Sequence, residues 1–190
     1  MSYTAHHWVV TASADHAARG RAEAIVQANH GKSAPLRRMR PGDGVVIYSP
    51  RSTYPDGPAL QAFTLIGRVA DAAPYAHELG HHVMWRRPVL WAEATSAPIR
   101  PLLPQLHLTM HLPAWGMAFR YGLSPLSQQD FDLIAQAMQA RFADHAQAPL
   151  QPLPLRTGPN THHPEPVGAC ARGEKKPRAE GAQFINRRHP

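Results

Sequence analysis

Short apolar runs alternate with turn-forming residues over most of the chain. The first run, His7–Thr11, is apolar and β-branched, which is typical of a strand. Residues 45–48 follow a Pro-Gly-Asp-Gly turn and predict a second strand, and residues 60–70 and 83–93 predict two more. Because the 60–70 run is apolar on both faces, we expect it to lie in a sheet that is covered on each side.

Two segments have the features of helices. An Ala-rich segment that Ser13 or Asp15 can cap predicts a helix through Ala28, followed by a loop over residues 30–35. A clearer helix follows Ser127, with apolar residues at helical spacing up to Phe142. Short strands mixed with two helices predict a compact α+β domain, a small open barrel flanked by helices.

The apolar pattern ends after His145. The remaining segment contains eight prolines and carries seven Lys and Arg against three Asp and Glu. Such a composition cannot bury enough apolar surface to fold. We therefore predict a domain over residues 1–145 and a Pro-rich, basic, disordered tail over residues 146–190.

The charge of the chain favours a polyanionic partner. The formal net charge is +7 and the isoelectric point is about 10.2, so nucleic acid is the natural polyanion to suspect. The single cysteine, Cys170, excludes an internal disulfide framework and suits a reducing compartment. Neither a signal peptide nor an apolar run of roughly 20 residues is evident. We expect a cytoplasmic protein with no membrane partner.

The loop His30-Gly31-Lys32 is the first of the candidate binding features. Gly31 lets the backbone approach a ligand closely, while His30 and Lys32 offer hydrogen-bond donors to an anionic or carbonyl oxygen. The alternative is a polar surface loop after a helix, where cations favour the helix dipole. Arg37 and Arg38, with Arg40 two residues on, could bind phosphates as forked donors or could simply be solvated.

Two further aromatic segments could contact a ligand. Tyr48 ends a strand, where it could stack on a base while the hydroxyl of Ser49, before Pro50, reads a polar base edge. A core tyrosine followed by a turn is the alternative. Trp115 and Arg120 lie in a segment with no regular pattern. These residues could form a wall on which a ligand stacks, or they could cover the core.

The sequence also matches the HExxH pattern of zinc hydrolases. On a helix, His77 and His81 would ligate zinc and Glu78 would activate water. The upstream Pro74, the internal Gly80 and a strand-like flank instead favour a loop between two strands. We therefore predict no catalytic residue, no metal site and no cofactor, with a zinc-dependent hydrolase as the alternative function.

Taken together, these motifs resemble the EVE domain family in its bacterial HGK-containing branch. The correspondence runs in order over residues 5–142, through Trp8-Val9-Val10, Ser13, His30-Gly31-Lys32, Gly42-Asp43, Tyr48-Ser49-Pro50, Trp115-Gly116 and Arg120-x-Gly122.

This resemblance implies a PUA-like pseudo-barrel related to YTH and ASCH domains. It implies a non-enzymatic, nucleic-acid-binding module whose pocket accepts a modified base, such as a methylated cytosine or adenine, flipped out of DNA or RNA. Unpairing costs a few kcal/mol, so single-stranded substrates should be preferred. The pocket residues it implies are Ser13, His30, Gly31, Lys32, Tyr48, Ser49, Pro50, Trp115 and Arg120, with Arg37, Arg38 and Arg40 on phosphates. A module that binds a small ligand or a protein through the same pocket stays open.

Overall fold

The computed structural model describes residues 5–143 of the chain. Its strands are β1 (His7–Thr11), β2 (Ile25–Val26), β3 (Gly44–Arg51), β4 (Ala59–Val69), β5 (Tyr75–Leu79), β6 (His82–Trp91), β7 (Ala97–Pro98) and β8 (Leu123–Leu126). Its helices are α1 (Ala14–Ala22), α2 (Ser33–Arg37), α3 (His107–Met110) and α4 (Gln128–Ala137), with the 3-10 turns η1 (Asn29–Gly31), η2 (Arg100–Leu102) and η3 (Trp115–Phe119). The predicted tail, residues 146–190, lies outside the described residues.

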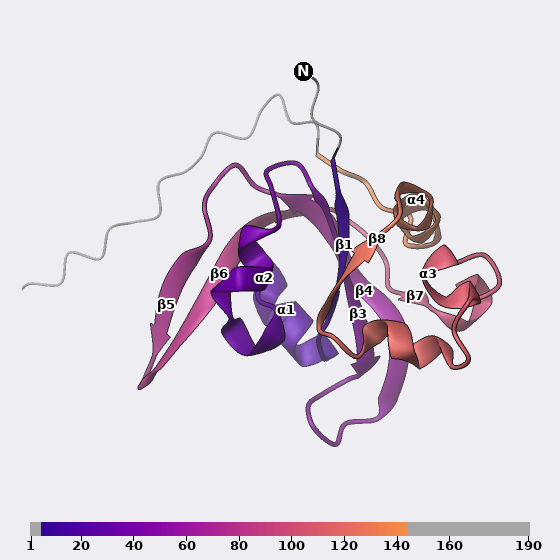
Figure 1. Cartoon of the computed structure of the whole chain (residues 1–190), viewed down its shortest axis with the longest axis horizontal. Coiled ribbons are helices and arrows are strands. Elements are labelled where there is room, and N and C mark those ends of the chain that lie inside the picture. The colour runs from indigo at the N-terminus through magenta and orange to yellow at the C-terminus, as the bar shows by residue number, and fades with distance from the viewer. Residues whose placement is uncertain (1–4, 144–190) are drawn as a thin grey trace, which may run out of the picture. The chain divides into compact units, whose positions relative to one another are not determined.

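All these strands belong to one sheet, which curls without closing (Figure 1). The strand order is β2-β6-β4-β3-β1-β8, with β5 on β6 and β7 on β4. Most neighbours are antiparallel, but β1 and β3 run parallel. The architecture confirms the predicted α+β class with an open, barrel-like sheet flanked by helices. Within the described residues, every helix is too short or too polar to cross a bilayer.

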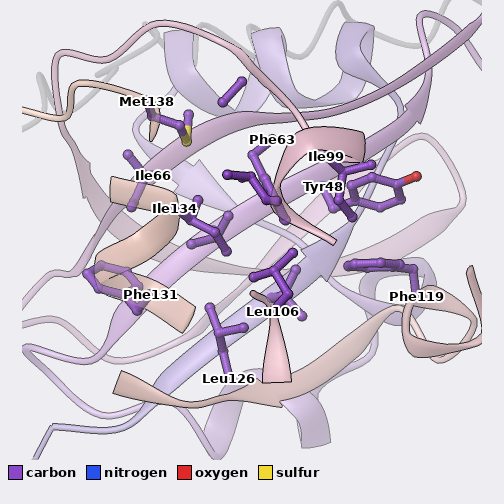
Figure 2. Packing of buried hydrophobic residues seen from close by; sticks show 14 of the residues in the cluster. Tyr48, Phe63, Ile66, Ile99, Leu106, Phe119, Leu126, Phe131, Ile134 and Met138 are labelled. Carbon is purple, nitrogen blue, oxygen red and sulfur yellow. The ribbon is translucent and has the colours of Figure 1, made fainter. Parts of the chain in front are cut away.

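The sheet buries an apolar layer on each face, as its alternating side chains require. Val9 contributes to a layer covered by η2, α3, η3 and α4, part of which Figure 2 shows. Its neighbours Trp8 and Val10 contribute to the opposite layer, under α1 and α2. On β4, Phe63 belongs to the first layer and Leu65 to the opposite layer, although residues two apart on a regular strand share a face. The alternation is interrupted here because β3 and β4 shift register beside Tyr48. The prediction that the long β4 run is covered on both sides is confirmed.

The first helix is shorter than predicted. It ends at Ala22, and Ala24 then takes a positive φ of 52°. The β-branched Ile25 and Val26 pair with β6, which lies some 60 residues later in the chain. The prediction that the helix continues through Ala28 is wrong because this long-range pairing outweighs the local preference of an Ala-rich segment for helix.

The predicted loop after residue 30 also contains a short helix. Helix α2 has Pro35 in its first turn, where a missing N–H costs no intrahelical bond. Leu36 is fully buried in the layer beneath α1 and α2 and anchors this helix to the sheet. The last helix begins after Ser127 as predicted, with the Ser127 hydroxyl accepting from the Asp130 N–H at 3.0 Å, but it ends at Ala137 instead of reaching Phe142.

A buried carboxylate joins β1 to the turn before β3. Asp43 is completely buried, and its oxygens accept from the His6 N–H at 3.0 Å, the Trp8 indole N–H at 2.8 Å and the Arg40 N–H at 2.9 Å. Hydrogen bonds to a charged acceptor are stronger than neutral ones. Asp43 therefore fixes the start of the parallel β1–β3 pair, and this pair carries the site described below.

His7 should make the stability of the domain depend on pH. Its ring is buried against Phe131, with ring centroids 4.4 Å apart. Burial lowers the pKa of His7 below 6.5, and the charge of Arg68 lowers it further. Because the unfolded chain takes up this proton at a higher pH, the contribution of His7 is complete above about pH 6.5 and is lost as the pH falls through the folded pKa.

We therefore expect the free energy of unfolding, measured in urea, to fall between pH 7 and pH 5. The fall should be smaller in His7→Gln, whose side chain does not titrate. The exposed His111 gives the matched control His111→Gln, which should keep the wild-type pH dependence. Equal pH dependence in His7→Gln and the wild type would contradict this assignment.

Candidate functional site

One edge of the sheet carries a cleft of about 710 Å³. Because β1 and β3 are parallel, both end at this edge, and the chain that enters β8 arrives there as well. The Thr11 N–H donates to the Gly122 carbonyl at 2.9 Å, and the Ala12 N–H donates to the Tyr48 carbonyl at 3.1 Å. The cleft is lined by Thr11, Ala12, Ser13, His16, residues 27–32, Pro50, Arg51, Thr53, Tyr54, Met84 and residues 119–122.

The loop on one side of the cleft has an unusual backbone. Asn29, His30 and Gly31 all have positive φ, at 50°, 58° and 74°. Such conformations cost free energy in residues other than glycine, and they concentrate at binding and catalytic sites. Gly31 is needed for a second reason, since a Cβ there would lie 2.9 Å from the Cβ of Met84 on β6. The loop is therefore pressed against the sheet while its side chains line the cleft.

Replacing Gly31 with alanine should be costly, and Gly42 offers a matched control. Gly42 has a φ of 83°, but a Cβ there would meet nothing within 4 Å. Gly42→Ala should therefore lower the free energy of unfolding by about 1–2 kcal/mol, the cost of holding a residue other than glycine at a left-handed φ. Gly31→Ala should lose roughly 1–3 kcal/mol more, because Met84 has to move. Thermal or urea unfolding measures both, and equal losses would contradict the packing argument.

The lining of the cleft is cationic. Lys32, Arg51 and Arg120 all line it and are exposed, and the exposed His30 and His16 lie among them. The Arg51 guanidinium is held in place because its Nη1 donates to the Gly57 carbonyl at 2.8 Å. Among the residues that the structure describes, no aspartate or glutamate lines the cleft. This distribution of charge favours an anionic ligand.

Two tyrosines with most of their surface in solvent also line the cleft. Tyr54 is 74% exposed and Tyr121 is 77% exposed, although large aromatic side chains are usually mostly buried. Sequence reasoning missed both, because neither belongs to the family motifs quoted above. Their position in irregular segments rich in Gly and Pro was the available signal, since a ring in such a segment often has no core to enter.

Six of the residues implied by the family resemblance come together in the cleft: Ser13, His30, Gly31, Lys32, Pro50 and Arg120. Ser13 precedes α1 without capping it through its side chain. Its hydroxyl lies 3.3 Å from Nδ1 of His16, which also accepts from the Arg19 guanidinium at 3.1 Å. Because arginine only donates, Nδ1 of His16 is the acceptor in this contact.

The structure places the other three outside the cleft lining. Tyr48 is buried near Phe119 (Figure 2) and stacks on its ring, with ring centroids 4.0 Å apart. Burial raises the pKa of Tyr48 to about 12. Ser49 is fully buried, with its hydroxyl 2.8 Å from that of Thr64. Trp115 packs edge-on against Tyr48 and Phe119. Since Phe119 lines the cleft, these aromatic rings support its wall from behind, and a direct contact with ligand stays a prediction.

The predicted phosphate-binding arginines are exposed but do not line the cleft. The Arg37 guanidinium lies over the ring of Trp85 at 5.3 Å, and that of Arg38 lies over the ring of Trp8 at 4.8 Å. Stacking on an indole orients a guanidinium and leaves its N–H donors free at the edge. The Arg40 N–H donates to Asp43. Phosphate contact by these three residues stays a prediction.

The HExxH segment forms a β-hairpin. His77 pairs with Met84 and Glu78 pairs with Val83, so these two side chains point to opposite faces of β5. The helical spacing that a zinc hydrolase needs is therefore absent, and the segment is a strand and a tight turn instead of the predicted loop. Over residues 5–143, no three His, Cys, Asp or Glu side chains gather closely enough to hold a metal ion.

Comparison with known proteins finds relatives that match most of the described residues. The family model described as EVE domain matches residues 6–137. The chain is 47% identical over 137 residues to the UPF0310 protein msl3206 of Mesorhizobium japonicum, covering 70% of this chain and 92% of that protein. It is 43% identical over 136 residues to a UPF0310 protein of Renibacterium salmoninarum, covering 72% and 97%. A crystal structure from Agrobacterium tumefaciens matches with 12% identity and a TM-score of 0.45, over 70% of this chain and 92% of that one. The predicted resemblance is confirmed, and the chain belongs to the EVE domain family.

Proposed function

We propose that this chain is a nucleic-acid-binding module that takes an unpaired, modified base, and that it is not an enzyme. The observation that carries the proposal is the composition of the cleft. Lys32, Arg51 and Arg120 line it without a carboxylate, and the exposed rings of Tyr54 and Tyr121 line it as well. Cations that follow a phosphate backbone, together with aromatic rings that stack on bases, are the usual components of a site for single strands.

The preference for single strands follows from what the tyrosines need. A ring can stack on a base only where the base is not already stacked inside a duplex. If Lys32, Arg51 and Arg120 each neutralise one phosphate, the logarithm of affinity should fall with the logarithm of salt concentration with a slope of about −2 for single strands. A slope near zero would indicate that the cleft does not contact the backbone.

The modified-base part of the proposal rests on family membership. EVE domains share the PUA-like fold, which is often used to bind nucleic acid, and the resemblance to YTH and ASCH domains implies a pocket for a flipped, modified base. The six family residues gathered in the cleft support the same location for the ligand. The hydrolase alternative gains no support from the hairpin at residues 77–81, where the metal-binding geometry is missing.

A binding panel tests this proposal. Single-stranded DNA and RNA oligonucleotides would carry 5-methylcytosine, 5-hydroxymethylcytosine, N6-methyladenine or no modification, and fluorescence anisotropy would give each Kd. We expect one modified strand to bind at least about tenfold more tightly than its unmodified counterpart, since a tenfold ratio is only 1.4 kcal/mol. Equal affinity for all strands would contradict recognition of a modified base. No binding at low salt would contradict nucleic-acid binding as well.

A further inference from the structure

A second, smaller cavity of about 230 Å³ lies between α1 and the sheet. It adjoins the cleft, because Ala12, His16, Gln27 and Met84 line both. None of the residues that the family resemblance implied for the pocket lines this inner cavity. Its size is below the range of about 300–1,000 Å³ for pockets that take drug-sized ligands, whereas the cleft lies within that range. The inner cavity therefore suits one ring system, and the cleft suits a longer segment of ligand.

The walls of the inner cavity suit a flat, apolar body. Ile47 and Leu65 from the sheet line it, and so does Trp91 on β6. The Trp91 ring is fixed because its N–H donates to the Gly20 carbonyl at 3.1 Å. Gly20 packs so closely that a Cβ there would lie 2.8 Å from the Ile25 carbonyl oxygen. The cavity is thus bounded by groups whose positions are set by packing on several elements.

Two residues that line this cavity each carry a buried hydrogen-bond donor with no partner in the described part of the chain. Nε2 of Gln27 and Nε of Arg86 are shielded from solvent, and neither bonds to any group in the described part of the chain. The Arg86 side chain is held by an ion pair with Glu23, so its Nε cannot swing freely to find a partner. Buried donors are nearly always paired in folded proteins, and an unpaired one calls for an explanation. Acceptor atoms of a ligand would supply the missing partners.

We infer that the inner cavity receives a single unpaired base, whose carbonyl or imino acceptor edge bonds Gln27 and Arg86. Trp91, Ile47 and Leu65 would contact the face and edge of its ring. The neighbouring nucleotides would stay in the cleft, where the tyrosines and cations lie. This inference rests on the proposed function, and it assigns base recognition to residues beneath α1 instead of those of the HGK loop.

The variant Gln27→Leu tests the inference, because it removes a donor while nearly keeping the size of the side chain. We expect it to weaken binding of the preferred modified strand about tenfold, the effect of one lost hydrogen bond to a buried partner. Binding of an abasic strand of equal length, which uses only the cleft, should weaken much less, although Gln27 lines the cleft as well. Gln105→Leu is the control, since Gln105 is exposed and lines neither cavity. Equal loss for modified and abasic strands would overturn the inference and leave the proposed function standing.

A measurement on the wild-type protein keeps the inference testable if Gln27→Leu does not fold. The indole N–H resonance of Trp91, assigned with Trp91→Phe, should shift when a modified strand binds. The indole of Trp8, which bonds Asp43 and lines neither cavity, should not shift. Binding without a Trp91 shift would overturn the inference. If no strand binds, the proposed function fails. Titration with free nucleosides then tests the inner cavity by itself. A shift of the Trp91 resonance would support a base site there, and no shift would overturn the inference.

Discussion

The double substitution Tyr54→Ala with Tyr121→Ala is expected to reduce the affinity for single-stranded oligonucleotides by about 2–6 kcal/mol. Removing an aromatic ring that stacks on a base costs roughly 1–3 kcal/mol per base. Both rings are largely exposed, so the folded state should lose little stability and the effect should fall on binding alone. Fluorescence anisotropy gives the affinities, and urea unfolding confirms that both proteins fold.

Tyr75→Ala is the matched control for this experiment. Tyr75 lies on β5, is 40% exposed and lines neither cavity, so its removal should leave affinity unchanged. A loss of less than about 1 kcal/mol in the double variant would show that the tyrosines do not stack on the ligand. A similar loss in Tyr75→Ala would show that binding is spread over the surface and is not confined to the cleft.

The variant Asp43→Ala should lose about 3–5 kcal/mol of unfolding free energy. It removes a fully buried carboxylate that accepts from three N–H groups, of which the Trp8 indole N–H is itself buried, and a buried donor left unpaired costs roughly 1–3 kcal/mol. Domains of this size have only about 5–15 kcal/mol in total. Urea unfolding followed by tryptophan fluorescence measures the loss, and the emission of Trp8 should change because its indole loses its partner.

Two further variants serve as comparisons for the stability loss expected of Asp43→Ala. Asp43→Asn keeps an acceptor oxygen in place and should lose roughly half as much. Asp71→Ala removes an exposed carboxylate and should stay within about 0.5 kcal/mol of the wild type. If Asp43→Ala lost less than about 1 kcal/mol, the carboxylate would not be the link between β1 and the turn before β3.

Four of the strands, β1, β3, β4 and β6, were predictable because their signals are local. The β1 run matches the structure residue for residue, and the long β4 run differs by one residue at each end. The Ser127 cap also follows from neighbouring residues alone. By contrast, the pairing of Ile25 and Val26 with β6 depends on a strand far away in the sequence. Tertiary contacts of this kind leave no trace in local composition.

The candidate site was predictable only in part. The motif His30-Gly31-Lys32 indicated the loop, and the structure adds that three consecutive positive φ values press it onto Met84. The expected strand over residues 45–48 places Tyr48 at its end, either as a stacking residue or as a core residue. The structure extends β3 to Arg51 and packs the Tyr48 ring in the core against Phe119. Tyr121, next to Arg120 and outside any strand, is exposed and lines the cleft. For a residue within a strand, such as Tyr48, sheet register decides which face the side chain occupies, and a single sequence does not fix that register.

The most direct test of nucleic-acid binding in the cleft is to map a short single-stranded oligonucleotide onto the isotope-labelled chain by NMR chemical-shift perturbation at about 50 mM salt. We expect the largest shifts at backbone amides of residues 29–32, 51–54 and 119–122, three segments that contribute to the lining of the cleft. Shifts confined to other surfaces, such as the β5–β6 hairpin or α3, would contradict binding in the cleft, as would the absence of any shift.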